Sequence, residues 1–290
     1  MKFEDPVLEK EFDRHYALRH RRWDRYGTAF HVACICTVLG RQQFEMSTHQ
    51  RIVLGVGFLN ELLPLLITVL PAKLYAPVRS WVVPSTFLCY IWLVPAIFSK
   101  WSVRQASRPP TAASLAYLFL VASNARFLGT TALARPTLLR QRLPILLLSL
   151  PFQLVSNQVT CLHRNWDPAV EAFTARLATA IARGSVPVFP PTAVLALRRV
   201  ACVFSMNWLM IVLGIAVPQF ILLKMECSMR SAFLVRAGRA PARLSRIVPS
   251  GWGAALALPI VLGSAFIVSL FTAQMPLLFG LDVGGHGPAP

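Results

Sequence analysis

The sequence predicts an all-α fold, a polytopic bundle of transmembrane helices, from its composition and its hydropathy pattern. Hydrophobic residues make up 55% of the 290 residues and charged residues only 14%, whereas soluble domains carry about 25% charged residues. Seven apolar stretches fill most of the chain, at 27–40, 52–71, 81–98, 111–133, 143–160, 200–223 and 251–274. A stretch of about 20 apolar residues crosses a bilayer as a helix, because backbone polar groups in lipid must pair within their own segment.

The first 26 residues are predicted to form a basic, amphipathic arm on the cytoplasmic side. Leu8, Phe12 and Tyr16 are four residues apart and share one helical face. The second half of the arm carries four arginines: Arg19, Arg21, Arg22 and Arg25. This combination is typical of a helix that lies on anionic lipid headgroups. The alternative is a solvated helix whose charges only set topology. The arm also offers a surface for protein partners.

The apolar stretch at 27–40 is the shortest, with 14 residues. That length is also typical of an interfacial or re-entrant segment, so a six-span bundle is the alternative to seven spans. Trp23 and Arg25 before the stretch and Arg41 after it are suitable interfacial anchors for a longer span. Seven spans are therefore the preferred prediction.

The distribution of lysine and arginine predicts the orientation of the chain. With seven spans, the loops on the side of the N-terminus contain 18 of these residues, and the opposite loops contain 10. Cytoplasmic loops carry the excess of positive charge, so the N-terminus is predicted to be cytoplasmic and the C-terminus to lie on the far side. With six spans the distribution is 17 to 11, and the two termini share the cytoplasmic side.

Residues 167–183 are predicted to form an interfacial helix, with Asp167 as N-cap, Pro168 as the first helical residue and Gly184 at its end. The loop after the sixth span is expected to contact lipid headgroups, as is the arm, through Arg236, Arg239, Arg243 and Arg246. Residues 27–280 are predicted to form one multi-pass transmembrane domain, followed by a flexible neutral tail at 281–290.

Glu61 lies at the middle of the second stretch, and Arg126 lies well inside the fourth. A charge at the bilayer centre costs about 2.5–3.5 kcal/mol on insertion scales, and pairing the two would offset much of that cost. Both spans run in the same direction, and a rise of 1.5 Å per residue separates the two positions by about 9 Å in depth. An arginine side chain can cover that distance, so a Glu61–Arg126 pair is predicted, either as a site or as a structural ion pair.

The polar residues inside the spans are the candidates for a functional site, because polar groups in lipid are costly. They are Asn60, Glu61, Asn124, Arg126, Gln153, Asn157 and Asn207. They either line a polar cavity for a solute or an ion, or form interhelical hydrogen bonds worth about 0.6 kcal/mol each. For Asn207 taken singly, the structural role is favoured.

Cysteines and histidines give no metal framework, and no metal or cofactor is predicted. Four cysteines lie in apolar stretches, where cysteine behaves as a small hydrophobic residue: Cys34, Cys36, Cys89 and Cys202. Cys161 and Cys227 lie in loops that the topology puts on opposite faces of the membrane, so they are not expected to pair.

The sequence shows no catalytic constellation, so a non-enzymatic protein is predicted. Its net charge of +17 lies in loops beside apolar helices, which favours anionic lipid over nucleic acid as a partner. Two classes of integral protein of the plasma membrane or an endomembrane are compatible with these features. The first is a sensory, signalling or scaffold module, and the second is a small-solute or ion transporter or channel with a site around Glu61 and Arg126. A water-filled path to Glu61 would favour transport, and a closed interior would favour the first class.

Overall fold

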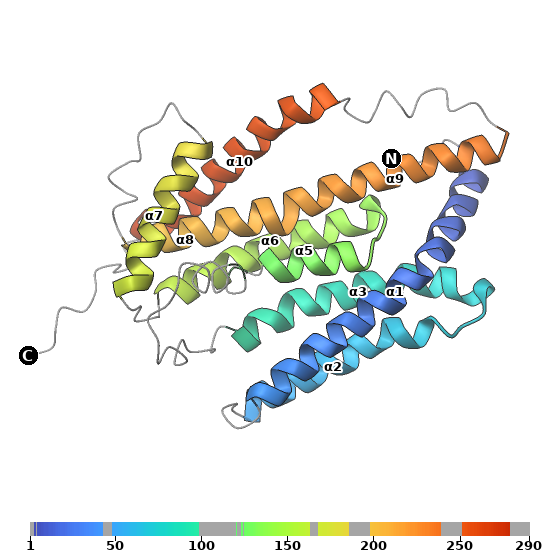
Figure 1. The fold of residues 1–290 in the computed structure, drawn as a ribbon, viewed down its shortest axis with the longest axis horizontal. Coiled ribbons are helices and arrows are strands. Elements are labelled where there is room, and N and C mark those ends of the chain that lie inside the picture. Colours follow the sequence, from blue (N-terminus) through green and yellow to red (C-terminus); the bar gives the residue numbers. More distant parts are fainter. Residues whose placement is uncertain are drawn as a thin grey trace, which may run out of the picture. The chain divides into compact units, whose positions relative to one another are not determined.

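The computed structural model describes residue 3 and residues 5–42, 48–98, 120, 123, 125–162, 168–185, 198–238 and 251–278. The secondary structure of these residues is helical and contains no strand (Figure 1), so the all-α prediction is confirmed for them. The elements are α1 (Pro6–Gln42), α2 (Thr48–Ile67), α3 (Ala72–Phe98), α5 (Ala125–Ala134), α6 (Leu139–Leu162), α7 (Pro168–Ser185), α8 (Arg198–Leu209), the π-helix η2 (Met210–Ala216), α9 (Val217–Arg236) and α10 (Gly251–Leu278).

Two helical runs among the described residues are long and apolar enough to cross a membrane, Leu139–Cys161 and Val200–Arg236. The segment Val261–Gln274 is apolar and shorter. These three segments coincide with the fifth, sixth and seventh predicted stretches and favour association with a membrane. They do not confirm the count of seven spans.

The chain divides into two compact units, each built from separate parts of the sequence. Unit 1 consists of Met1–Lys100, Phe127–Leu150 and Val217–Ser250. Unit 2 consists of Trp101–Arg126, Pro151–Ala216 and Gly251–Pro290. Helix α6 contributes residues to both units, and so does the uninterrupted run from α8 through η2 to α9. The single domain at 27–280 stays a prediction, and the tail at 281–290 lies outside the described residues.

In unit 1, helix α1 packs against α2 and α3, which lie side by side and are joined by a short turn (Figure 1). Helix α2 ends at Ile67, after which the N–H groups of Thr68, Val69 and Leu70 donate to carbonyls three residues earlier. Pro71 then precedes the first residue of α3. This tight reversal holds α2 and α3 together as a hairpin, against which the long helix α1 is placed.

The arm and the stretch at 27–40 form one continuous helix, α1, rather than an interfacial helix followed by a separate span. The face predicted to lie on lipid is buried in protein, because Phe12 and Tyr16 pack with Leu138 and Met229. Rings from other segments of unit 1 complete this contact, with the Phe12 and Phe233 centroids 5.6 Å apart. The lipid-facing prediction for this apolar face is therefore wrong, since aromatic partners within the chain cover it.

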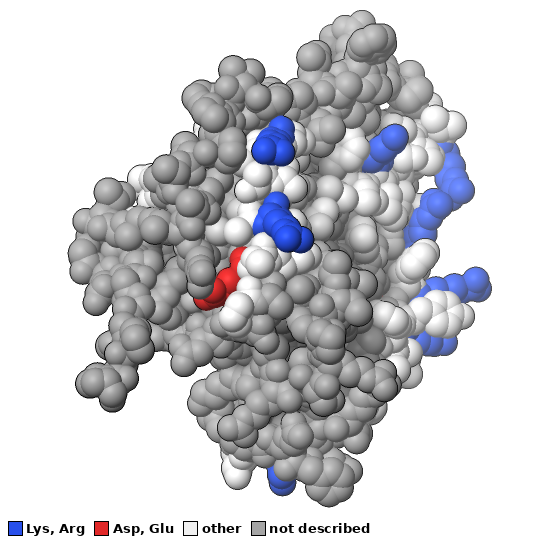
Figure 2. Space-filling view, turned by 60° about the vertical axis from the view of Figure 1, so that its left-hand side comes forward, with Lys and Arg blue, Asp and Glu red and all other residues white. Residues whose placement is uncertain are grey.

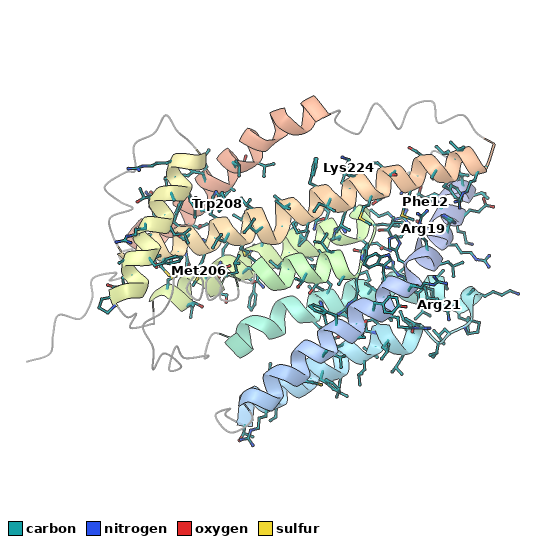
Figure 3. All side chains as sticks on the ribbon, in the orientation of Figure 1. Phe12, Arg19, Arg21, Met206, Trp208 and Lys224 are labelled. Atoms are coloured by element: carbon teal, nitrogen blue, oxygen red, sulfur yellow. A yellow bond between two sulfur atoms is a disulfide. The ribbon has the colours of Figure 1, made fainter. Side chains whose placement is uncertain are left out.

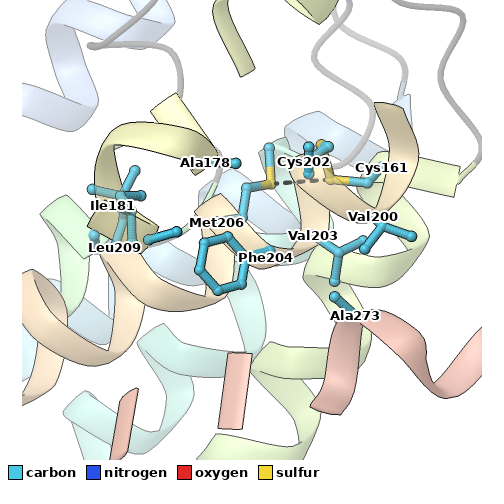
Figure 4. Packing of buried hydrophobic residues seen from close by; sticks show 13 residues of the cluster. Cys161, Ala178, Ile181, Val200, Cys202, Val203, Phe204, Met206, Leu209 and Ala273 are labelled. Atoms are coloured by element: carbon cyan, nitrogen blue, oxygen red, sulfur yellow. Dashed lines mark hydrogen bonds between the residues drawn. A yellow bond between two sulfur atoms is a disulfide. The ribbon is translucent and has the colours of Figure 1, made fainter. Parts of the chain in front are cut away.

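In unit 2, helices α7, α8 and α10 pack around a hydrophobic cluster that includes Ala178, Phe204, Met206 and Ala273 (Figure 4). Helix α7 matches the helix predicted at 167–183 to within two residues, with Pro168 at its start; Asp167 lies outside the described residues. Since Ala178 is fully buried in this cluster, α7 covers α8 rather than lying on the membrane surface alone.

A disulfide joins Cys161 at the end of α6 to Cys202 in α8, with the two Cα atoms 5.9 Å apart (Figure 4). The prediction that Cys202 acts as a small hydrophobic residue is therefore wrong. The two cysteines are 41 residues apart in the sequence, and only the packing of α8 beside α6 brings them within bonding distance.

Candidate functional site

Glu61 lies at the centre of a buried polar cluster in unit 1, which we call the Glu61 cluster. Its Oε2 accepts a hydrogen bond from Nη2 of Arg135 and lies 3.5 Å from Nδ1 of His31. Arg135 also bonds to Thr86 Oγ1 at 3.4 Å, and Asn60 donates to the carbonyl of Thr86 at 3.1 Å. Helices α1, α2 and α3 and the end of α5 each supply a member. The side chain of Glu61 is fully buried, so a charged carboxylate is removed from both water and lipid.

The cation that pairs with Glu61 is therefore Arg135, whereas the sequence predicted Arg126. The side chains of Asn124 and Arg126 lie outside the described residues, so the Glu61–Arg126 pair stays a prediction. Arg135 follows the last residue of α5 and precedes Pro136, which ends the helix because the residue before proline disfavours helical backbone. The sequence signal that could have identified Arg135 as the partner of Glu61 is its position, two residues beyond the predicted end of the fourth stretch.

A second buried group, the Asp24 cluster, joins α1 to α3. Arg79 donates to both carboxylate oxygens of Asp24, from Nε at 2.5 Å and from Nη2 at 2.9 Å. The Tyr75 hydroxyl donates to Asp24 at 2.5 Å, and Arg79 also donates to the carbonyl of Pro136 at 2.7 Å. Asp24 and Tyr75 have no exposed surface. This bidentate geometry is the strongest form of an arginine–carboxylate pair.

A third group, the Glu9 cluster, joins α1, α9 and the start of α6. Arg230 donates to both oxygens of Glu9, from Nη1 at 2.7 Å and Nη2 at 2.9 Å, and to Glu226 at 3.1 Å. Arg140 pairs with Glu9 at 2.6 Å and with Asp13. The N–H of Leu139, in the first turn of α6, has no partner within the helix. It donates to the Glu226 carboxylate at 2.9 Å. Three carboxylates and two arginines thus hold three separate chain segments together.

The pKa values on the arm follow from these contacts. Burial opposes ionisation of Glu9, but hydrogen bonds from Arg230 and from the Phe3 N–H outweigh it and lower the pKa of the Glu9 carboxyl. Burial raises the pKa of Asp13. Burial also lowers the pKa of His20 to about 4, and its Nδ1 lies 2.8 Å from the Tyr16 carbonyl, so the neutral ring donates there.

Of the other predicted residues, Asn157 and Asn207 come together in unit 2. Asn157 donates to Asn207 at 2.8 Å, and Asn207 donates to the Thr272 hydroxyl at 2.9 Å. These contacts link α6, α8 and α10, which fits the interhelical role predicted for Asn207. Gln153 is buried in α6. The predicted set therefore separates into two places, with Asn60 and Glu61 in unit 1 and the amides of the fifth and sixth stretches in unit 2.

The arginines predicted to contact lipid differ in exposure. Arg19, Arg22, Arg25 and Arg236 are exposed, while Arg239, Arg243 and Arg246 lie outside the described residues. Arg21 is half-buried and points toward the turn between α2 and α3 (Figure 3). It donates to the carbonyls of Thr68 and Leu70, so its guanidinium binds backbone within unit 1, and its predicted contact with lipid stays a prediction. These carbonyls follow the last residue of α2 and give the guanidinium partners within the chain.

Among the described residues, acidic side chains and arginines are buried in equal number. Glu9, Asp24, Glu61 and Glu226 are all buried. Figure 2 shows several separate lysine and arginine patches on the described part of one face, with acidic side chains gathered in one small area. Arg79, Arg135, Arg142 and Arg230 are buried as well. Four guanidinium groups therefore balance the four carboxylates, and the net charge of +17 belongs to the remaining residues.

Sequence reasoning missed most members of the three clusters. Arg79, Arg135, Arg140 and Arg230 lie in the predicted loops, and Asp24 lies in the predicted amphipathic arm. Their shared signal was loop charge on the N-terminal side of the membrane, which was used only to set orientation.

Comparison with protein-family models, curated proteins and solved structures finds no match to this chain.

Proposed function

We propose that this chain is a non-enzymatic integral membrane protein that works as a sensory, signalling or scaffold module. The observation that carries this proposal is the closure of the Glu61 cluster. Glu61 is 0% exposed, and its partner Arg135 is 3% exposed. A paired and sealed carboxylate stabilises one arrangement of helices, which is the behaviour of a structural core rather than of a water-filled path.

We further propose seven spans with a cytoplasmic N-terminus. A seven-span topology puts four segments on the same side of the membrane. They are the arm and the loops before the third span, before the fifth span and after the sixth span. The contacts of Asp24 with Arg79, and of Glu9 with Arg140 and Arg230, join these same segments. A six-span topology would put the arm opposite the other three, so these ion pairs support seven spans.

The disulfide supports the same topology. Seven spans put Cys161 and the start of the helix that contains Cys202 on the side away from the cytoplasm, whereas six spans put them on the cytoplasmic side. Disulfides persist in oxidising compartments and are rare in the cytosol. The pair Cys161–Cys202 is therefore in better agreement with seven spans and a cytoplasmic N-terminus.

A transporter or channel for a small solute or an ion is the second candidate. One specific observation favours it, because Glu61 Oε1 and Arg135 Nε are buried and have no hydrogen-bond partner among the described residues. Unsatisfied polar atoms on a buried pair are groups that a passing solute or water could bind. In this alternative the same pair would be a transport site.

Solvent access to the Glu61 cluster separates the two functions. Thr86→Cys places a thiol beside Arg135, and Lys73→Cys provides an exposed control on the same helix. Liposomes that contain each variant are treated with a membrane-impermeant maleimide, and peptide mass spectrometry reads each position separately from the native thiols. The proposed function predicts labelling at 73 and protection at 86 until the protein is denatured. Labelling at 86 in intact protein would support transport instead.

The topology is tested by protease protection of an epitope tag on either end of the chain. Seven spans predict that a C-terminal tag is protected in inside-out membrane vesicles, whose cytoplasmic face is turned outward, while an N-terminal tag on that face is digested. Digestion of both tags would mean that residues 27–40 do not cross and that six spans replace seven.

A further inference from the structure

A small cavity lies in unit 1 beside the Glu61 cluster. Its volume is about 10 Å³, close to the smallest space that holds one water molecule. Val83, Phe87 and Ile145 contribute apolar walls, and Thr131, Arg135 and Arg142 contribute polar groups. No acidic side chain is among the residues that line it. The cavity is therefore bounded by two guanidinium groups in an otherwise apolar surrounding.

Three of the lining residues keep a hydrogen-bond donor without a partner among the residues that the structure describes. The unpartnered buried atoms are Arg142 Nη2, Arg135 Nε and Thr131 Oγ1. Arg142 is 2% exposed, so water outside the protein does not satisfy it. A buried donor left without a partner costs about 1–3 kcal/mol, and more when it is charged. Three such donors around one small space indicate a missing acceptor.

The charge around the cavity indicates what kind of acceptor is missing. Arg135 is compensated by Glu61. Arg142 donates to neutral groups, the Gln219 side-chain oxygen and the Thr137 carbonyl at 3.0 Å. The carboxylate whose charge acts on Arg142 is that of Glu226, and its oxygens already bind Arg230 and the Leu139 N–H. A buried cation without a directly bonded counter-charge is strongly unfavourable.

We propose that this cavity binds a chloride ion, held by Arg142, Arg135 and Thr131. A monatomic anion accepts hydrogen bonds from several directions at once and neutralises the Arg142 guanidinium. The cavity is too small for phosphate or a carboxylate ligand, and a water molecule would fill the space without supplying charge. This inference is independent of whether the protein is a scaffold or a transporter.

Chloride-dependent stability tests the proposal. The full chain is purified in detergent with gluconate as the anion, and thermal unfolding is followed as chloride replaces gluconate at constant ionic strength. A ligand that binds only the folded state raises the melting temperature in a saturable way. We expect such a rise with chloride and bromide, and a smaller one with iodide because of its size.

Two variants and a control locate the ion. Arg142→Met should abolish the chloride dependence. Thr131→Val, which keeps side-chain volume, should weaken the apparent affinity about tenfold through loss of one hydrogen bond to an anion. Arg140→Gln is the matched control, because Arg140 lies two residues away and pairs with Glu9 and Asp13 instead. It should leave the chloride dependence unchanged, whatever its effect on absolute stability.

Identical unfolding of the wild-type protein in chloride and gluconate would overturn the proposal and leave water as the occupant. A chloride effect that survives Thr131→Val and Arg142→Met unchanged would also overturn it, since the ion would then bind elsewhere. If Arg142→Met does not fold, the Thr131→Val titration alone decides, because a neutral isosteric change is not expected to prevent folding.

Discussion

Buried arginines dominate the polar interior of unit 1 at the scale of single residues. Arg79, Arg135, Arg142 and Arg230 are each 3% exposed or less. An arginine cannot lose its proton at ordinary pH, so burial forces it to find carboxylates, carbonyls or anions. Each of the first two has its own carboxylate, and Arg230 binds Glu226 and shares Glu9 with Arg140. The arrangement makes stability depend on a few pairs whose members cannot be removed singly.

The Glu61–Arg135 pair gives the sharpest residue-scale prediction. Glu61→Gln and Arg135→Gln should each destabilise the protein by about 3–5 kcal/mol, because each leaves an uncompensated buried charge, and the double variant should lose much less than their sum. Denaturant unfolding in detergent measures the cycle. Arg126→Gln combined with Glu61→Gln should be additive. Strong coupling to Arg126 instead would restore the pair predicted from the sequence.

His20 should make stability depend on pH. Its folded pKa of about 4 lies below the ordinary value of 6.5 because of burial, so the unfolded chain binds more protons between these two values. Stability is then complete above about pH 6.5 and falls as the pH decreases toward 4, by about 3 kcal/mol at most. Unfolding of wild type and His20→Asn across this range isolates the effect. Parallel pH profiles for the two proteins would show that His20 is not the cause.

At the scale of elements, the assembly of unit 1 depends on close approach of helix α1 to its neighbours. A Cβ atom added to Gly27 would lie 2.6 Å from the carbonyl oxygen of Ala134, at the end of α5. Arg21, less than two turns earlier, binds the carbonyls that follow α2. One helix thus contacts two helix ends, where backbone groups have no intrahelical partner.

Gly27→Ala should destabilise the protein by about 1–3 kcal/mol, because the added methyl group meets backbone rather than a flexible side chain. Gly55→Ala in α2 is the matched control, since nothing lies within 4 Å of its added Cβ. That change should be neutral or stabilising by up to about 1 kcal/mol through helix propensity. Equal effects of the two substitutions on thermal unfolding would refute the close packing of α1 on α5.

Arg21→Gln should destabilise the α2–α3 turn by about 1–3 kcal/mol, because it removes donors to two carbonyls. Arg22→Gln, one residue along the same helix and exposed, should change stability by less than about 0.5 kcal/mol. Hydrogen exchange of the amides in 65–75 reports the turn directly. Faster exchange in both variants, or in neither, would argue against this role of Arg21.

At the scale of the whole chain, no single stretch of sequence forms either unit. Unit 1 takes residues from three parts of the chain, as does unit 2. In unit 1, ion pairs between distant segments make the connections, such as Glu9 with Arg230, which are 221 residues apart. In unit 2, the disulfide and the Asn157–Asn207–Thr272 hydrogen bonds connect α6, α8 and α10.

The disulfide should contribute measurably to the stability of unit 2. Replacing Cys161 and Cys202 together by alanine should cost about 2–4 kcal/mol, in line with loops of this size. A reductant should lower the stability of the wild-type protein in the same way. Cys89→Ser is the control, because Cys89 is a free, exposed thiol. Unfolding that is insensitive to reductant would mean that the bond is not formed in the purified protein.

Sequence reasoning singled out Glu61, Asn157 and Asn207 because a polar residue inside an apolar stretch stands out, but it did not predict the contact between the two asparagines. It missed Arg135, Asp24 and Arg79 because charges near helix ends have the same pattern whether they face water, headgroups or each other. The arm was misread for a related reason. The apolar face that contains Phe12 and Tyr16 has the same helical periodicity whether it packs on lipid or on protein.

The sequence by itself determined the helical class, the approximate positions of the apolar helices and the excess of positive charge, because these depend on local periodicity and composition. Tertiary structure decided which charges pair, which cysteines bond and which faces are buried. Those choices depend on contacts between residues tens to hundreds of positions apart, and the two units draw on interleaved parts of the chain. Glu61 shows the difference: its burial was predictable from its neighbours, while its pairing with Arg135 was decided by where α5 ends against α1 and α2.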